Sequence, residues 1–168
     1  NGIIAADATS KAPPDGHTLL LMSTSHTMNA AVYKLPFDPV QAFTPVMMLG
    51  SGPLVLVAHP SFPASSVKAV IALAKAKPKA LKYAIAGTGG INHFSGALFA
   101  HMAGIELTHV PYKGGAQGLA QLMGGEVELM FGPLALSLRQ IRSGRIKALG
   151  VTTTQRSPLL PGIPTIAE

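Results

Sequence analysis

Apolar residues fall into short continuous runs that are separated by turn residues along most of the chain. The runs that predict strands occupy residues 17–23, 43–50, 53–59, 81–87, 107–112, 127–132 and 146–152. Most of them are continuous rather than alternating, which is typical of strands covered on both faces. The apolar pattern therefore predicts a sheet with packed layers on both sides.

Segments with helical spacing lie between the later runs, at residues 65–78, 91–104, 116–125 and 135–144. In the first of them, apolar residues share one face and lysines the other, Ser65 or Ser66 fits the N-cap, and Pro78 marks the end. Residues 53–152 thus alternate as βαβαβαβαβ. This order predicts an α/β fold with a mostly parallel sheet and helices on both faces.

The flanking segments differ from this regular block. Residues 1–52 and 153–168 are richer in turn residues. We expect them to form a partial first lobe, with residues 53–152 as a complete second lobe.

Composition narrows the class of protein. The chain has 168 residues, of which 48% are apolar, enough for a packed core. Its net charge of +6 favours anionic partners. The basic residues are scattered and aromatic residues make up only 5%, which argues against nucleic-acid binding. Cysteine is absent, which excludes disulfides, thiolate metal sites and thiol nucleophiles.

The least ordinary turn is Gly87-Thr88-Gly89-Gly90, between a predicted strand and a predicted helix. Ligands of parallel sheets bind beyond the carboxyl ends of strands, and a helix N-terminus offers unpaired N–H groups to an anion. We expect free N–H groups from Thr88 to Ile91, with the Thr88 hydroxyl as a further donor. The alternative, in which these glycines serve only the tight packing of the turn, stays open. Asn92 breaks the dinucleotide fingerprint and no Gly-Lys-Ser/Thr follows, which disfavours a nucleotide.

Two further turns are candidates for anion binding. Ser23-Thr24-Ser25-His26 ends a predicted strand and offers hydroxyl donors, either to a carboxylate or to a helix cap. Tyr112-Lys113-Gly114 ends another strand, where Lys113 either contacts an anion or is solvated.

Catalytic and metal-binding signals are weak. His93 begins a predicted helix, where it faces either the cleft or a packed interior. The six histidines include no H-x-x-x-H pair, and no G-x-S-x-G elbow is present. We therefore expect no metal, no cofactor and no enzymatic activity.

Three motifs in order along the chain, PDGHTLL, HVPYKGG and RSPLLPGIPTIAE, resemble those of the substrate-binding proteins of tripartite tricarboxylate transporters, the TctC or Bug receptor family. The resemblance covers nearly the whole chain. It implies a periplasmic receptor of the type II periplasmic-binding-protein fold, whose two lobes close on a small carboxylate and deliver it to membrane permease subunits without catalysis.

The family motifs imply a set of ligand-binding positions in the three turns. These are Ser23, Thr24, Ser25, His26, Gly87, Thr88, Gly89, Gly90, His93, Tyr112, Lys113 and Gly114. At one departure, Gly132-Pro133 stands where many relatives carry Asp-Asn. This change removes polar side chains from a strand end.

Family members are nearly twice as long, so we expect a fragment or a truncated relative whose first lobe is incomplete. An uncovered sheet edge in residues 1–52 then predicts self-association. An alternative is the ligand-sensing effector lobe of a transcription regulator, which shares this fold. An enzyme for a phosphorylated metabolite is a third interpretation, and it lacks catalytic partners.

Overall fold

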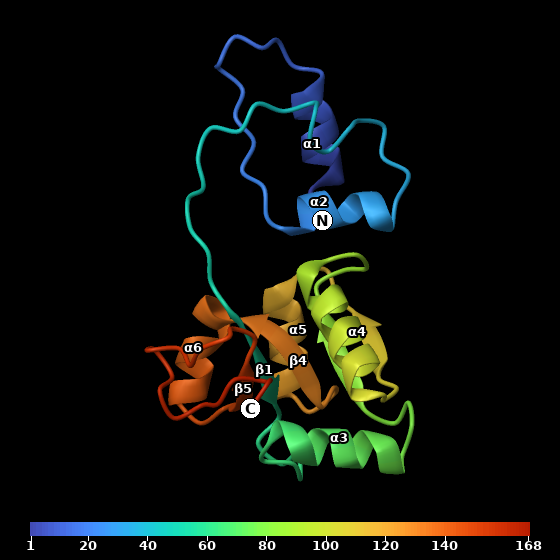
Figure 1. The fold of residues 1–168 in the computed structure, drawn as a ribbon, viewed down its shortest axis with the longest axis vertical. Helices are drawn as coiled ribbons and strands as arrows, with labels where there is room; N and C mark the ends of the chain where they lie inside the picture. Colours follow the sequence, from blue (N-terminus) through green and yellow to red (C-terminus); the bar gives the residue numbers. More distant parts are fainter.

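The computed structural model describes residues 1–168 and has two parts, a sheet covered by helices and a smaller part above it (Figure 1). Five strands form the single sheet: β1 (Leu54–Ala58), β2 (Lys82–Ile85), β3 (Thr108–Pro111), β4 (Leu129–Pro133) and β5 (Lys147–Val151). The helices between them are α3 (Val67–Ala76), α4 (Ile91–Ala103), α5 (Gly115–Met123) and α6 (Leu134–Arg142). The predicted alternation of strands and helices is confirmed. None of the helices has the length and apolar character that crossing a bilayer requires.

The strand order is β3-β2-β4-β1-β5. β2 pairs in parallel with β3 and β4, whereas β1 pairs antiparallel with β4 and β5. Strands β2, β3, β4 and β5 run in one direction, as the prediction of a mostly parallel sheet requires. The prediction is wrong for β1, which runs in the opposite direction. The helix after β1 lies across the lower end of the sheet (Figure 1). Through this connection, β2 runs opposite to β1. The sequence pattern of strand, helix and strand is the same as in a parallel crossover, so the sequence alone did not show the reversal.

The core has two layers, because successive side chains of a strand point to opposite faces. In β4, Leu129 and Phe131 belong to a layer covered by α3 and α4. Met130 belongs to the other layer, covered by α5 and α6. The prediction of helices on both faces is confirmed, and the carboxyl end of β2 is thereby fixed beside the start of α4.

Residues 1–52 contain helices and no strand. The elements are α1 (Ile3–Ser10), α2 (Ser25–Met28) and the 3-10 helix η1 (Asn29–Ala31). The predicted strands at 17–23 and 43–50 are wrong, since both segments are irregular. Most of their apolar side chains are exposed, with Leu21 at 79% and Met48 at 80%. A strand needs a neighbour for its backbone groups, and no hydrogen-bonded ladder forms here.

The segment after β5 packs against the sheet. Thr165 forms a parallel bridge with Val151, the Ile166 N–H donates to the Val151 carbonyl at 2.9 Å, and Leu160 is buried in the α5 and α6 layer. The assignment of residues 153–168 to a first lobe stays a prediction. In this chain they extend the packing of the sheet-containing part.

Candidate functional site

A cavity of about 470 Å³ lies between residues 1–26 and the start of α4. Its apolar lining consists of Ala5, Leu20, Leu21, Met22, Ala86 and Ile91. The other lining residues are Asn1, Gly2, Ser23, Ser25, His26, Gly90 and Asn92. Four of the predicted site residues, from the hydroxyl-rich turn and the glycine turn, thus share one cavity.

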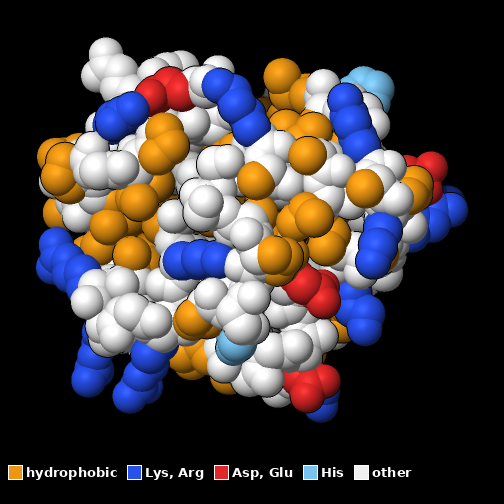
Figure 2. All heavy atoms as spheres, turned by 90° about the horizontal axis from the view of Figure 1, so that it is seen from below, with side chains coloured by type: hydrophobic (Ala, Val, Ile, Leu, Met, Phe, Trp, Pro, Cys, Tyr) orange, Lys and Arg blue, Asp and Glu red, His pale blue; other side chains and the backbone are white.

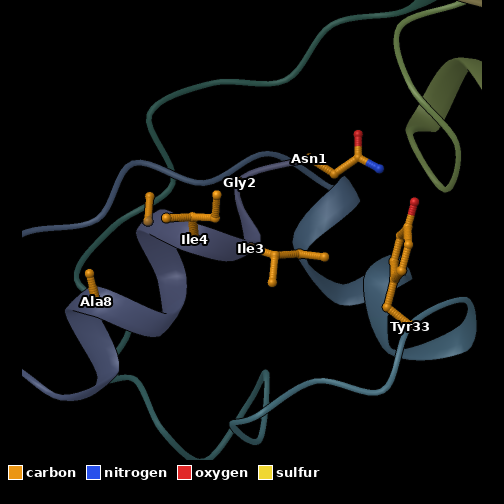
Figure 3. A pocket seen from close by; sticks show the side chains of 7 residues that line it. Asn1, Gly2, Ile3, Ile4, Ala8 and Tyr33 are labelled. Atoms are coloured by element: carbon orange, nitrogen blue, oxygen red, sulfur yellow. The ribbon is translucent and has the colours of Figure 1, made fainter. Parts of the chain in front are cut away.

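A larger hollow of about 670 Å³ lies against α1. Apolar residues dominate its lining, and it contains none of the predicted site residues; Figure 3 shows its lining side chains. The smaller cavity is the candidate site, because polar groups from both parts of the chain converge there.

The glycine turn needs glycine at two positions. Gly87 and Gly89 have φ angles of 109° and 77°, in the region that side chains with a Cβ rarely adopt. The Gly90 N–H donates to the Gly87 carbonyl at 3.3 Å and closes the turn. Gly90 then caps α4, so the turn directs the first helical N–H groups toward residues 1–33.

The expectation that the N–H groups from Thr88 to Ile91 are free is wrong for three of them. The Gly90 N–H is used within the turn, and the Gly89 N–H donates to His93 Nδ1 at 3.2 Å. The Ile91 N–H donates to Ser25 Oγ at 3.2 Å, because α2 brings this nearly buried hydroxyl to the start of α4. A hydroxyl that accepts one hydrogen bond still has a proton to donate. Ser25 therefore links α4 to the cavity with a donor to spare.

Two side chains from the N-terminal part hold the Thr88 carbonyl. Tyr33 Oη donates to it at 2.8 Å, and the Asn1 amide donates to it as well. Figure 3 shows both side chains pointing toward the loop that carries the turn. Sequence reasoning missed both residues, and the Thr88 contact seen here is through its carbonyl rather than the predicted hydroxyl.

His93 holds the turn from within α4. Its Nδ1 accepts the Gly89 N–H, and its ring lies 4.8 Å from the ring of His109, centroid to centroid. Burial, and to a lesser degree the charge of His109, lower the pKa of His93. The neutral ring is therefore favoured, as an acceptor of this hydrogen bond requires. His93 does not line the cavity, and its contact with a ligand stays a prediction.

His26 is held by its own surroundings. Its Nε2–H donates to the Pro39 carbonyl at 2.8 Å, and its ring packs on Phe37 and Phe43 at centroid distances of 6.0 and 5.1 Å. His26 as a whole residue is 5% exposed. It lines the cavity as part of a packed aromatic group.

The third predicted turn does not reach the cavity. The Lys113 N–H donates to Gln117 Oε1 at 2.9 Å, and Tyr112 packs against the α5 and α6 layer. Thr24, Gly114 and the first three residues of the glycine turn are also absent from the lining. Binding roles for these positions stay predictions.

Asn92 is a residue that sequence reasoning did not assign to the site. It is 5% exposed, and its amide donates to the Phe131 carbonyl, which ties the start of α4 to β4. Its place in the first turn of the helix after the glycine turn is the signal that could have identified it.

Charged side chains lie outside the cavity. None of the 13 lysines and arginines and none of the seven acidic residues lines it. On the face seen from below, Lys and Arg side chains are spread among uncharged and apolar surface (Figure 2). The side-chain donors that this chain contributes to the cavity are therefore uncharged.

Comparisons with known proteins place this chain in a family. The sequence profile of the tripartite tricarboxylate transporter family receptor, TctC, matches residues 1–168. BugT of Bordetella pertussis is 36% identical over 170 residues, which cover 99% of this chain and 52% of that protein. These matches cover nearly all of this chain, which spans about half the length of each of the curated relatives.

Solved structures agree with this match. R. palustris Rpa4515 with adipate has a TM-score of 0.93 and 39% identity, covering 99% of this chain and 56% of that chain. MatC (Rpa3494) from Rhodopseudomonas palustris with bound malate has a TM-score of 0.90 and 30% identity, covering 99% and 57%. The predicted type II periplasmic-binding-protein fold is thereby confirmed.

Family and fold are those of solute-binding receptors and not of enzymes. Receptors of this kind are periplasmic. These matches favour the receptor interpretation over the transcription-regulator alternative. The chain belongs to the tripartite tricarboxylate transporter receptor family, TctC.

Proposed function

We propose that the gene product that contains this chain is a periplasmic solute receptor, which binds a small organic carboxylate in the cavity at the start of α4. One observation carries the proposal: Ser25 Oγ and the first N–H of α4 meet at 3.2 Å on the wall of the cavity. Adipate and malate in two structural relatives support a carboxylate as the ligand class.

The chemistry of this wall suits a carboxylate. The 13-residue helix α4 places the positive end of its dipole at the cavity, which favours a negative charge. Ser23 and Ser25 add hydroxyl donors from the opposite side. Hydrogen bonds to a charged group contribute about 1.5–3 kcal/mol each, so a few neutral donors suffice without a lysine or arginine.

We further propose that the receptor delivers its ligand to the permease subunits of a tripartite tricarboxylate transporter. Membership of the receptor family supports this partner. Self-association of the 168-residue chain is a separate proposal. It rests on the exposed apolar segments 17–23 and 43–50, which take the place of the sheet edge expected from the sequence.

Isothermal titration calorimetry of the gene product against organic acids and sugars tests the carboxylate proposal. Ser25→Ala should raise the Kd of a bound carboxylate roughly ten- to hundredfold, because a donor to a charged group is lost. Ser65→Ala, an exposed serine before α3, serves as the matched control. Binding of sugars and of no carboxylate, or an unchanged Kd in Ser25→Ala, would contradict the proposal.

A further inference from the structure

We infer that Asn1 is a site of spontaneous modification, at which deamidation converts the side-chain amide to a carboxylate and thereby weakens the binding of an organic anion in the cavity. The inference is carried by the Asn1-Gly2 dipeptide and by the contacts of the Asn1 amide with the glycine turn. The modification itself is independent of any ligand. Its effect on binding rests on the proposed function.

The residue after Asn1 makes the reaction accessible. In deamidation the backbone nitrogen of the next residue attacks Asn Cγ and a five-membered succinimide closes. The bond from Cγ to the side-chain nitrogen breaks, and this nitrogen leaves as ammonia with the proton of the attacking N–H. Water then opens the ring to aspartate or isoaspartate. Glycine hinders the attack least, because it has no Cβ. Of the three asparagines in the chain, only Asn1 is followed by glycine.

The local structure leaves the reacting groups accessible. Asn1 and Gly2 are both exposed. Gly2 is the N-cap of α1, and hydrogen bonds within a helix do not use the N–H of its N-cap residue. The other two asparagines, Asn29 and Asn92, are 1% and 5% exposed and lie within helices. Reactivity is therefore expected at Asn1 alone.

The Asn1 amide is in contact with the glycine turn. Its nitrogen donates to the Thr88 carbonyl. A Cβ at Gly87 or Gly90 would lie 3.4 or 3.3 Å from its oxygen. An ionised aspartate has no N–H to donate, so a carboxylate oxygen at this position would face the Thr88 carbonyl oxygen. Deamidation thus removes one of the two hydrogen bonds that join the N-terminal part to the turn.

The new charge also lies where the carboxylate is proposed to bind. Asn1 lines the same cavity as Gly90, which caps α4, and Ser25, whose Oγ accepts the first N–H of this helix. Two negative charges close together repel each other, and the carboxylate of the protein would compete for the positive end of the helix dipole. The deamidated protein should therefore bind an organic anion more weakly.

Peptide mapping by mass spectrometry tests the modification on the gene product. After incubation for days at pH 8.5 and 37 °C, Asn1 should convert to aspartate and isoaspartate, while Asn29 and Asn92 stay intact as internal controls. Asn1→Gln should not convert, because its longer side chain would have to close a six-membered ring, which is much slower. Absence of conversion at Asn1, or equal conversion at the two buried asparagines, would overturn the inference.

Calorimetry with adipate and malate measures the effect on binding. Asn1→Asp places the reaction product at this position and should raise the Kd about tenfold or more. Gln155→Glu adds the same charge at an exposed residue outside the cavity and should leave the Kd unchanged. The incubation should weaken binding by the wild type and not by Asn1→Gln.

The outcomes separate this inference from the proposed function. Equal Kd values for Asn1→Asp and Gln155→Glu, or binding that conversion of Asn1 leaves unchanged, would overturn the inference while carboxylate binding stands. If the unmodified protein binds no carboxylate, the proposed function and the effect on binding are both overturned, whereas conversion of Asn1 would still support the modification.

Discussion

At the scale of single residues, Tyr33 joins the N-terminal part of the chain to the glycine turn. Its hydroxyl donates to the Thr88 carbonyl at 2.8 Å, and this contact holds one side of the cavity against the other. Tyr33→Phe removes a hydrogen bond with a net contribution of about 0.5–1.5 kcal/mol. We therefore expect carboxylate binding by the gene product to weaken about two- to tenfold in calorimetry.

Thr108→Val is the matched control for this change, because it removes a hydrogen bond from a hydroxyl to a carbonyl, Thr108 Oγ1 to Lys79 at 2.8 Å, and neither residue lines the cavity. It should leave the Kd unchanged. Equal losses in the two variants would show that the Tyr33 contact does not hold the cavity.

His93 makes the glycine turn sensitive to acid. Its neutral Nδ1 accepts the Gly89 N–H, and the ionisable groups packed around it are His109 of β3 and Tyr83 of β2, whose hydroxyl donates to the His93 carbonyl at 3.4 Å. Burial first, and His109 second, hold the pKa of His93 in the folded protein below its usual value of 6.5. The stability that this provides is present above pH 6.5 and is lost as the pH falls through the lowered pKa.

Urea unfolding at pH 7.5 and pH 5 measures this loss. The wild-type chain should lose more free energy of unfolding between these pH values than His93→Asn, whose side-chain oxygen accepts the same N–H without titrating. Equal losses in the two proteins would contradict the assignment to His93.

The residues that could be predicted are those with a local signal. Gly90 lies in a turn whose glycines identify a helix start after β2, and the hydroxyls around Ser25 identify the start of α2. Asn1 and Tyr33 carry no such signal, since they reach Thr88 across 87 and 55 residues of chain. The place of residues 20–22 in the cavity lining was equally hidden, because these residues have the apolar pattern of a buried strand.

At the scale of elements, α3 shows how one side chain fixes a helix boundary. The sequence offers two serines for its N-cap, and the structure assigns Ser66, whose Oγ accepts the Ala69 N–H at 3.2 Å. Ser66→Ala leaves this N–H without its partner. We expect the free energy of unfolding to fall by about 1 kcal/mol in urea titrations.

Ser65→Ala is the neighbouring control and should be within experimental error of the wild type, because this side chain caps nothing in the structure. If Ser65→Ala lowered the free energy of unfolding more than Ser66→Ala, the assignment of the N-cap to Ser66 would be wrong.

Most elements of the sheet-containing part were predictable because they bury an apolar face; the edge strand β3, whose residues are exposed or half-buried, is the exception. The direction of β1 was not predictable, since α3 connects it across the end of the sheet (Figure 1). Helix α1 was missed as well. Its residue Ile4 is 89% exposed, so the amphipathic pattern that identifies a packed helix is absent.

At the scale of the whole molecule, the charged side chains lie apart from the candidate cavity. The net charge of +6 attracts anions over the whole surface, whereas the cavity itself contains no charged side chain. Long-range attraction can thus raise the encounter rate of any organic anion. Under the proposed function, the hydroxyls of Ser23 and Ser25 and the start of α4 then hold the carboxylate.

The N-terminal part gives the last prediction, which concerns the 168-residue chain by itself. Leu21 and Met48 lie in irregular segments with the apolar pattern of buried strands, and they are 79% and 80% exposed. Exposed apolar segments with unpaired backbone groups pair readily with another copy. Sedimentation velocity should therefore show a dimer or larger species whose population grows with concentration.

The double variant Leu21→Lys with Met48→Lys should shift the chain toward monomer. The control is Ala116→Lys with Ala120→Lys, which adds the same charge on the exposed side of α5 and should not shift it. If the chain stayed monomeric at every concentration, these exposed apolar segments would not be sites of self-association.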